Sequence, residues 1–191
     1  MRALILVDIQ NDFLPGGALA VPNGDEVVPV ANKVMKEIDL VVATQDWHPA
    51  NHGSFAANHA GKNPGDVTEL NGLRQILWPV HCVQGTRGAE FHRDLLEDPR
   101  VHVVSKGLGD EDNYSAFDGT TLAEDLRREG VGEVWVGGLA TDYCVKQTVL
   151  DALHAGFRVR ALRDAMRAVN LQPGDDQRAL AEMRAAGAEI V

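Results

Sequence analysis

The amino-acid sequence predicts a three-layer α/β/α fold, in which helices cover both faces of an open, mainly parallel sheet of about six strands. Short apolar runs alternate with segments of helical periodicity on both sides of a long irregular stretch. Several of these runs are continuously apolar, as in strands that are buried on both faces of a parallel sheet. With 45% hydrophobic and 24% charged residues, the chain has the composition of a globular protein, and we expect one domain over residues 1–191.

The first half of the chain begins with a strand, a helix and a second strand. The first apolar run, 3–7, ends at Asp8, and the second, 39–44, is followed by Asp46. Between them, apolar residues recur at helical spacing over residues 25–36. The pattern then breaks down in a long excursion at about 46–97, which is rich in Gly, Pro, Asn and His. Loops of this length in compact domains usually carry function.

The second half continues the alternation. A strand is expected at 101–105, ending at Lys106, and another at 133–136. Helical spacing follows from Val145 to Leu153, and Gly156 supplies a stop. The remaining expected elements are helices at 121–129 and 173–186 and strands at 157–162 and 188–191.

Cys144 lies where the strand at 133–136 gives way to a helix. The turn between them contains small residues and two candidate N-caps, Thr141 and Asp142. We therefore expect Cys144 in the first turn of the helix, where unpaired backbone N–H groups and the helix dipole favour a thiolate. The same N–H groups are suited to binding an oxyanion. The alternative is a buried cysteine that packs as a small hydrophobic residue.

Four chemically capable side chains follow the ends of successive expected strands: Asp8, Asp46, Lys106 and Cys144. In open α/β sheets, ligands bind at the carboxyl edge of the strands. If the strands are parallel neighbours, these side chains meet in one cleft, although the sequence separates them widely. A single aspartate or lysine at a strand end has the ordinary alternative of a solvated surface residue, but four together favour a functional site.

A second group consists of Asp46, His48 and His81, with His52 nearby in the sequence. One carboxylate and two imidazoles form a ligand set that suits zinc, iron or manganese. In an extended segment Asp46 and His48 point to the same side. The alternative is a pair of loop histidines and a capping aspartate. Cys82, beside His81, is expected to be a buried thiol.

Composition limits the partners and the compartment. The formal net charge of -10 argues against nucleic acid or an anionic membrane as a partner. No window is long and apolar enough for a membrane span, and no signal peptide is apparent. The two cysteines, Cys82 and Cys144, form no disulfide framework. We expect a cytoplasmic protein with reduced thiols.

The sequence resembles the nicotinamidases, which belong to the isochorismatase-like cysteine hydrolases. The resemblance runs in order across nearly the whole chain, from residue 4 to about residue 165. Its segments are VDIQNDF at 7–13, QDWHP at 45–49, WPVHCVQGT at 78–86, KG at 106–107, DNYSAF at 112–117 and GLATDYCV at 138–145. The set Asp46, His48 and His81, with Trp78 before it, is what points to nicotinamidases within the wider superfamily.

The resemblance implies a catalytic triad of Asp8, Lys106 and Cys144. It also implies a cis peptide before Ala140 and an oxyanion hole formed by the backbone N–H groups of Ala140 and Cys144. In this mechanism Lys106 favours the thiolate, Asp8 takes the thiol proton, and the sulfur attacks the carboxamide of nicotinamide. Asp8 then protonates the departing ammonia and activates the water that hydrolyses the thioester. The expected role is in NAD salvage.

The resemblance further implies one divalent metal ion, held by Asp46, His48 and His81, with His52 left open as a further ligand. Zinc is the expected ion, with iron and manganese as alternatives. The metal would hold the pyridine nitrogen and orient the amide. The ring is expected between Phe13 and Trp78, with Tyr114 lining the cleft, although Phe13 and Tyr114 are equally consistent with structural packing.

Other functions remain open on the sequence alone. A related cysteine amidohydrolase would act on another carboxamide or an N-carbamoyl compound, and such relatives generally lack the metal set. A binding or regulatory protein could retain the fold, although the intact triad argues against it. A thiol redox role for Cys144 and Cys82 lacks the Cys-x-x-Cys spacing. The oligomeric state is not predicted, and a homo-oligomer is left open.

Overall fold

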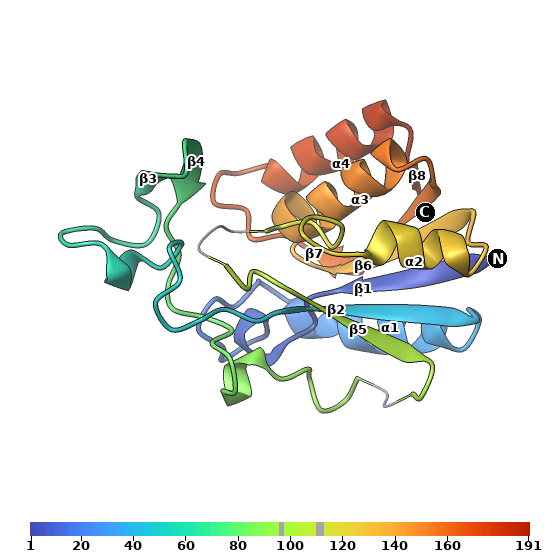
Figure 1. Ribbon diagram of the computed structural model, residues 1–191, viewed down its shortest axis with the longest axis horizontal. Coiled ribbons are helices and arrows are strands. Elements are labelled where there is room, and N and C mark those ends of the chain that lie inside the picture. The colour runs from blue at the N-terminus through green and yellow to red at the C-terminus, as the bar shows by residue number, and fades with distance from the viewer. Residues whose placement is uncertain (96–97, 110–112) are drawn as a thin grey trace.

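The central sheet contains six strands that all run parallel (Figure 1), in the computed structural model, which describes residues 1–95, 98–109 and 113–191. This agrees with the predicted mainly parallel sheet of a three-layer α/β/α fold. The strands lie in the order β5 (Val101–Lys106), β2 (Leu40–Asp46), β1 (Arg2–Val7), β6 (Glu133–Leu139), β7 (Arg158–Arg167) and β8 (Glu189–Ile190).

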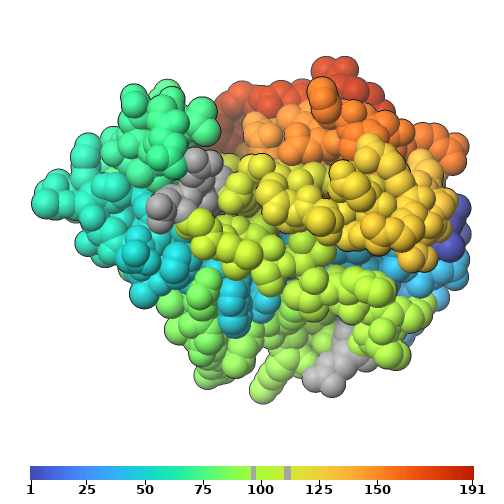
Figure 2. Space-filling model, viewed as in Figure 1, coloured from blue at the N-terminus to red at the C-terminus, as the bar shows by residue number. Residues whose placement is uncertain are grey.

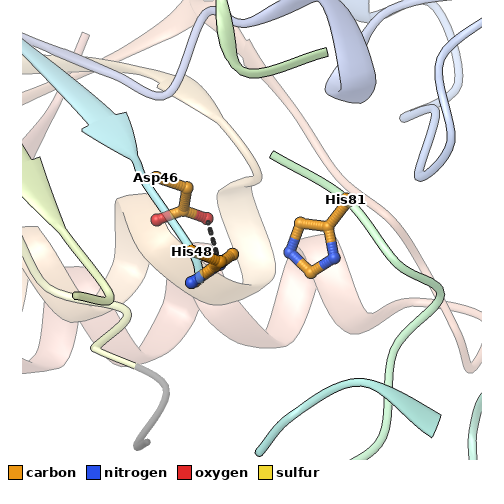
Figure 3. Close-up of side chains that lie close together, drawn as sticks. All are labelled: Asp46, His48 and His81. Carbon is orange, nitrogen blue, oxygen red and sulfur yellow. Dashed lines mark ion pairs between the residues drawn. The ribbon is translucent and has the colours of Figure 1, made fainter. Parts of the chain in front are cut away.

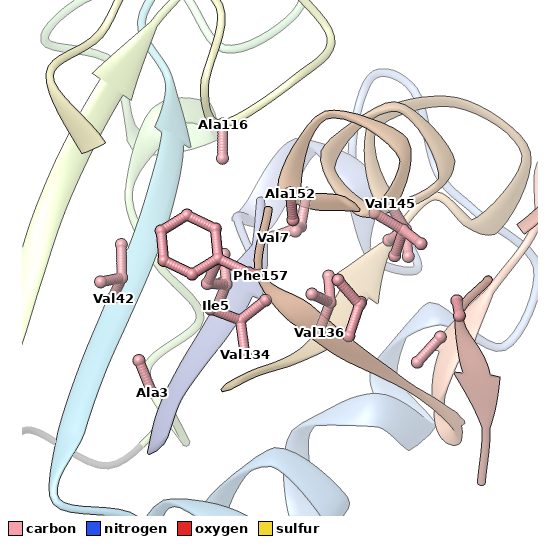
Figure 4. Close-up of a cluster of buried hydrophobic side chains, with 14 of the residues drawn as sticks. Ala3, Ile5, Val7, Val42, Ala116, Val134, Val136, Val145, Ala152 and Phe157 are labelled. Carbon is pink, nitrogen blue, oxygen red and sulfur yellow. The ribbon is translucent and has the colours of Figure 1, made fainter. Parts of the chain in front are cut away.

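Helices cover both faces because alternate side chains of the central strands point to opposite sides. On one face, Leu4 and Leu6 of β1 belong to a buried cluster with α1 (Val27–Met35). On the other face, Ile5 and Val7 belong to a cluster with residues of α2 (Leu122–Arg128), α3 (Lys146–His154) and α4 (Asp175–Ala186). Figure 4 shows part of this second cluster. Each fully buried aliphatic side chain of this kind stabilises the fold by about 1.5–3 kcal/mol.

The expected elements are present, with shifted ends. β7 differs most, because it continues to Arg167 where the apolar pattern stops at residue 162. Its pairing with β6 changes register between Val136 and Gly138, and then resumes with Gly138 opposite Met166. Exposed residues in the middle of β7, Arg163 and Asp164, interrupt the apolar run without ending the strand. The extension carries the chain to the carboxyl edge of the sheet.

The long excursion after β2 contains a short antiparallel hairpin that the periodicity did not predict. Its strands are β3 (Val67–Leu70) and β4 (Leu73–Ile76). They are joined by Asn71-Gly72, and both of these residues have positive φ, as tight hairpin turns require. The part of the excursion around β3 and β4 forms a lobe at the end of the molecule opposite both termini (Figures 1 and 2). Residues 96–97, at its expected end, and Asp112 of the DNYSAF segment lie outside the described residues.

No helix in the described ranges is both long and apolar enough to cross a membrane.

Candidate active site and metal centre

The ends of β1, β2 and β5 bring three charged side chains together near Cys144: Asp8, Asp46 and Lys106. Asp46 and Lys106 lie opposite each other in the register of β2 and β5, and Asp8 follows the last residue of β1. Lys106 Nζ lies 2.9 Å from Asp8 Oδ2 and 3.6 Å from Cys144 Sγ, and it also donates a hydrogen bond to Asp46 Oδ1. All four residues are buried. The structure therefore places the four predicted strand-end residues in one cluster.

This cluster holds one cation between two carboxylates, and its ionisation follows from that arrangement. Burial raises the pKa of Asp8 to about 6, and the nearby Asp46 carboxylate adds to this effect. Burial opposes ionisation of Asp46 too, but the charge of Lys106 lowers the Asp46 pKa below its usual range. Although burial alone would lower the pKa of Lys106, Asp46 and Asp8 raise it well above its usual value. Lys106 is therefore the fixed cation of the site, and Asp8 is the carboxylate suited to exchanging a proton near neutral pH.

Cys144 lies in a π-helical turn, Thr141–Val145, that connects β6 to α3. The turn begins after Ala140, whose carbonyl oxygen accepts hydrogen bonds from the N–H groups of Tyr143 and Val145, both at 3.1 Å. The expected N-caps, Thr141 and Asp142, are wrong, because Ala140 occupies that position. The peptide between Leu139 and Ala140 is cis, as the resemblance implied.

The side chains of Asp46, His48 and His81 form a compact buried group (Figure 3), with one ligand atom of each within 4.8 Å of the others. His48 Nδ1 lies 2.9 Å from the carbonyl oxygen of Gly107, and His81 Nδ1 lies 2.7 Å from that of Pro79. A carbonyl oxygen only accepts hydrogen bonds, so Nδ1 carries the hydrogen in both rings and Nε2 is the ligand atom. One carboxylate oxygen and two Nε2 atoms are a suitable donor set for a divalent metal ion. These residues fit a metal site.

Gly107 is required for this arrangement, and sequence reasoning gave it no role. A Cβ atom at this position would lie 2.4 Å from Cε1 and 2.6 Å from Nδ1 of His48. Gly107 also has a φ of +65°, which favours glycine. The residue after Lys106 therefore fixes both the position and the tautomer of a metal ligand.

His52 is buried beside the metal group but is not part of it. Its ring centroid lies 4.2 Å from that of His48, and its Nδ1 lies 2.8 Å from the hydroxyl oxygen of Ser54. The group whose ligand atoms lie within 4.8 Å of one another consists of Asp46, His48 and His81 among the described residues. This geometry favours His52 as a residue that supports the His48 ring.

A small, mainly apolar pocket of about 30 Å³ lies beside Cys144, below the range of volumes typical of ligand sites. It contains Phe13, Trp78 and Tyr114, the three residues expected to line a cleft. Trp78 Nε1 donates a hydrogen bond of 3.1 Å to the Tyr114 hydroxyl, which fixes these two rings relative to each other. The remaining lining residues are Leu19, Val21, Asp46, His81, Ala140, Tyr143, Cys144 and Val169.

Sequence reasoning missed Tyr143 and Val169 in this pocket. Tyr143 follows from its place next to Cys144, and its ring packs edge-on against Trp78 with centroids 5.0 Å apart. Val169 comes from the loop after β7, beyond the expected end of that strand, so no motif pointed to it.

The second cysteine is separated from solvent. Cys82 is fully buried, and burial raises the pKa of its thiol far above the usual range. Both cysteines are free. Of the two, Cys144 is the cysteine that lines the pocket and contacts Lys106.

Comparison with known proteins places these features in a family. The isochorismatase domain matches residues 2–191. A nicotinamidase of Escherichia coli (strain K12) is 50% identical over 200 residues, which cover 99% of this chain and 93% of that protein.

Two solved structures are closely similar to this one. A nicotinamidase and pyrazinamidase of Acinetobacter baumanii has a TM-score of 0.94 and 42% identity, with 100% of this chain and 95% of that chain covered. The pyrazinamidase of Pyrococcus horikoshii in complex with zinc has a TM-score of 0.85 and 45% identity, with 100% and 98% covered. Together with the family match along residues 2–191, these similarities show that the chain belongs to the isochorismatase family of hydrolases.

Proposed function

We propose that this chain hydrolyses nicotinamide to nicotinate and ammonia through a thioester on Cys144. The observation that carries the proposal is the position of Lys106, whose Nζ contacts Asp8 and Cys144 while also bonding the metal-site residue Asp46. Cys144 of the catalytic cluster and Asp46 and His81 of the metal group line the same pocket, together with aromatic side chains. The E. coli relative, named as a nicotinamidase, supports the same activity.

Substrate binding is assigned to the aromatic pocket. Phe13, Trp78 and Tyr114 surround the ring, and Tyr143 packs against Trp78 beside the nucleophile. Asp46, His48 and His81 would hold one divalent ion, which would supply a Lewis acid for the pyridine nitrogen. The zinc complex of the Pyrococcus horikoshii relative supports zinc as that ion. His52 supports His48 through the ring contact.

Acylation begins with transfer of the Cys144 thiol proton to Asp8 Oδ2, while the charge of Lys106 stabilises the thiolate. The sulfur then attacks the carboxamide carbon and forms a C–S bond. The backbone N–H groups of Ala140 and Cys144 are assigned to the resulting oxyanion. As the C–N bond breaks, Asp8 returns its proton to the nitrogen, which leaves as ammonia.

Deacylation uses Asp8 a second time. The carboxylate accepts a proton from water as the water oxygen attacks the thioester carbon. The C–S bond then breaks, the thiol of Cys144 is regenerated with the proton held by Asp8, and the nicotinic acid product loses its carboxyl proton to solvent and leaves as nicotinate. The raised pKa of Asp8, about 6, suits a group that must both accept and donate a proton near neutral pH.

The setting proposed for this reaction is NAD salvage in the cytoplasm, which is consistent with two free cysteines. The substrate is a small molecule, and no role is proposed for nucleic acid or membrane. A homo-oligomer stays an open prediction. The alternative substrate, an N-carbamoyl compound, has no pyridine nitrogen for a metal ion in the wall of the pocket to bind.

The test is ammonia release from nicotinamide by the purified protein, with and without added zinc, compared with the same assay on N-carbamoyl amino acids. We expect rapid release from nicotinamide, and none from either substrate with Cys144→Ala. Release from the N-carbamoyl compounds alone would contradict the proposal. Ammonia release unaffected by complete metal removal would leave the amidase activity but contradict the metal's role.

A further inference from the structure

Asp142 connects the turn that carries Cys144 to a loop that lines the same pocket. One of its carboxylate oxygens accepts the backbone N–H of Val169 at 3.0 Å, and the other accepts that of Asn170 at 2.8 Å. Asp142 lies two residues before Cys144, and only 8% of its surface is exposed. Both oxygens of a buried carboxylate are thus committed to two successive N–H groups of one loop. Hydrogen bonds to an ionised acceptor are stronger than neutral ones, so this contact is a firm attachment.

The loop that Asp142 holds contributes to the pocket. Val169 lines the pocket with Leu19 and Val21, while Phe13 and Trp78 line it from other segments. Val169 lies outside the regular structure, two residues after the end of β7. Its position is therefore set by contacts of the loop and not by the strand ladder.

The far end of the loop is anchored as well, but to a different element. Asn170 has a φ of +53°, and its side-chain oxygen accepts the N–H of Asp176 in the first turn of α4 at 2.9 Å. Asp175 accepts the N–H of Gln172 at 2.8 Å. These contacts fix the loop to α4, whereas Asp142 alone among these residues fixes it to the Cys144 turn.

We infer that Asp142 is a positioning residue for substrate binding, because it ties Val169, which lines the pocket, to the turn that carries Cys144. This inference rests on the proposed hydrolysis of nicotinamide. Asp142 does not touch the substrate or the reacting atoms. It acts through Val169, so its loss changes how well the ring is held and leaves the reactivity of the thiol intact.

The test compares Asp142→Asn with wild type. Asparagine has the same shape, but its amide nitrogen is a donor that faces one of the two N–H groups, so one hydrogen bond is lost and a repulsive contact replaces it. We expect KM for nicotinamide to rise by roughly tenfold, the scale at which a loosened apolar pocket loses discrimination, while kcat changes by less than about threefold. Val169→Ala should have an effect of the same kind.

A double-mutant cycle identifies the route of the effect. If Asp142 acts through Val169, the KM of the Asp142→Asn/Val169→Ala variant should be close to that of the more severe single variant. If the KM of the double variant rose by the product of the two single fold-increases, the two residues would act independently and the inference would be overturned. Asp142→Ala, which removes both acceptors, should raise KM further in the same direction.

Asp175→Asn is the matched control, because it weakens the same loop at its α4 end. Its KM should stay near the wild-type value. The rate at which iodoacetamide alkylates Cys144 should also be unchanged in Asp142→Asn, because this small reagent does not need the ring wall. A fall in kcat and in alkylation rate with unchanged KM would show that Asp142 acts on the Cys144 turn, and would overturn the inference. A wild-type protein without nicotinamide turnover would instead contradict the proposed function.

Discussion

The hydroxyl group of Thr44 holds Asp8 at two points. Thr44 Oγ1 accepts the backbone N–H of Asp8 at 3.1 Å and donates its own hydrogen to Asp8 Oδ1 at 2.5 Å. Asp8 has a φ of +49°, which is unusual for a residue with a side chain. Because Oδ1 is already hydrogen-bonded to Thr44, Oδ2 is the oxygen that faces Lys106 and receives the proton.

Thr44→Val should move the low-pH side of the activity profile to higher pH. The Thr44 hydrogen bond lowers the pKa of Asp8, so its removal raises that pKa above about 6. Activity requires the Asp8 carboxylate, so it is lost as pH falls through this pKa, and the variant should lose it earlier. The measurement is kcat/KM from about pH 5 to about pH 8. Thr44→Ser keeps the hydroxyl and should restore the wild-type profile, and an identical profile for the valine variant would contradict this role.

Cys144→Ala should reduce turnover by at least about a thousandfold while leaving nicotinamide binding nearly intact, because the covalent step needs the thiolate. Brief alkylation at neutral pH, followed by mass spectrometry, should label Cys144 and leave Cys82 unmodified. Cys82 has no exposed surface, and burial raises its pKa. Labelling of Cys82 before Cys144 would show that the nucleophile is assigned incorrectly.

Lys106→Met should shift the pH profile of Cys144 alkylation upward by about 1–3 units, since it removes a positive charge 3.6 Å from the sulfur. It also leaves two buried carboxylates without their cation, at a cost to stability of about 3–5 kcal/mol. Thermal unfolding therefore has to be measured beside the alkylation rates, at temperatures where the variant is folded. An unshifted pH profile of alkylation in the folded variant would show that Lys106 does not influence the ionisation of the Cys144 thiol.

Gly107→Ala should weaken metal binding by about 10–100-fold, because the new methyl group collides with the His48 ring. Metal affinity is measured by competition with a chromophoric chelator. Gly109→Ala is the matched control, since a Cβ there meets no atom of the described residues within 4 Å. Equal affinities for the two variants would contradict the positioning role of Gly107.

Metal removal should reduce the preference for nicotinamide over benzamide, which lacks the ring nitrogen. On the metal-loaded protein we expect benzamide to react on the order of 100-fold more slowly, the scale of one lost positioning contact. Chelation, or His81→Ala, should abolish most of this preference along with most of the activity. If the loaded protein hydrolysed both amides at the same rate, the ring nitrogen would have no metal contact.

The sequence was sufficient to predict the sheet and the residues at its carboxyl edge, because buried parallel strands are continuous apolar runs and their ends are marked by Asp8, Asp46 and Lys106. It was not sufficient for features that depend on tertiary contacts. The end of β7 is hidden by exposed polar residues, so Val169 had no predicted place in the site. Asp142 matched an N-cap by residue type, but its carboxylate bonds to a loop distant in sequence.

The hairpin of β3 and β4 shows that periodicity can also miss an element that its turn residues indicate. Asn71-Gly72 is a strong local signal for a hairpin, but the short flanking strands β3 and β4 have little apolar alternation, so periodicity alone passed over them. The close approach of Gly107 to His48 is equally invisible in sequence, because it joins segments that are distant along the chain.

Two consecutive residues at the end of β5 contact the two parts of the site. Lys106 places a positive charge beside Cys144, and Gly107 orients the ring of His48 in the candidate metal group. Substitution of the candidate metal ligands would affect more than metal binding. Replacing Asp46 would remove a carboxylate partner of Lys106 and redistribute the charge around Cys144. A variant without the metal group would therefore need another anion beside Lys106 in place of Asp46.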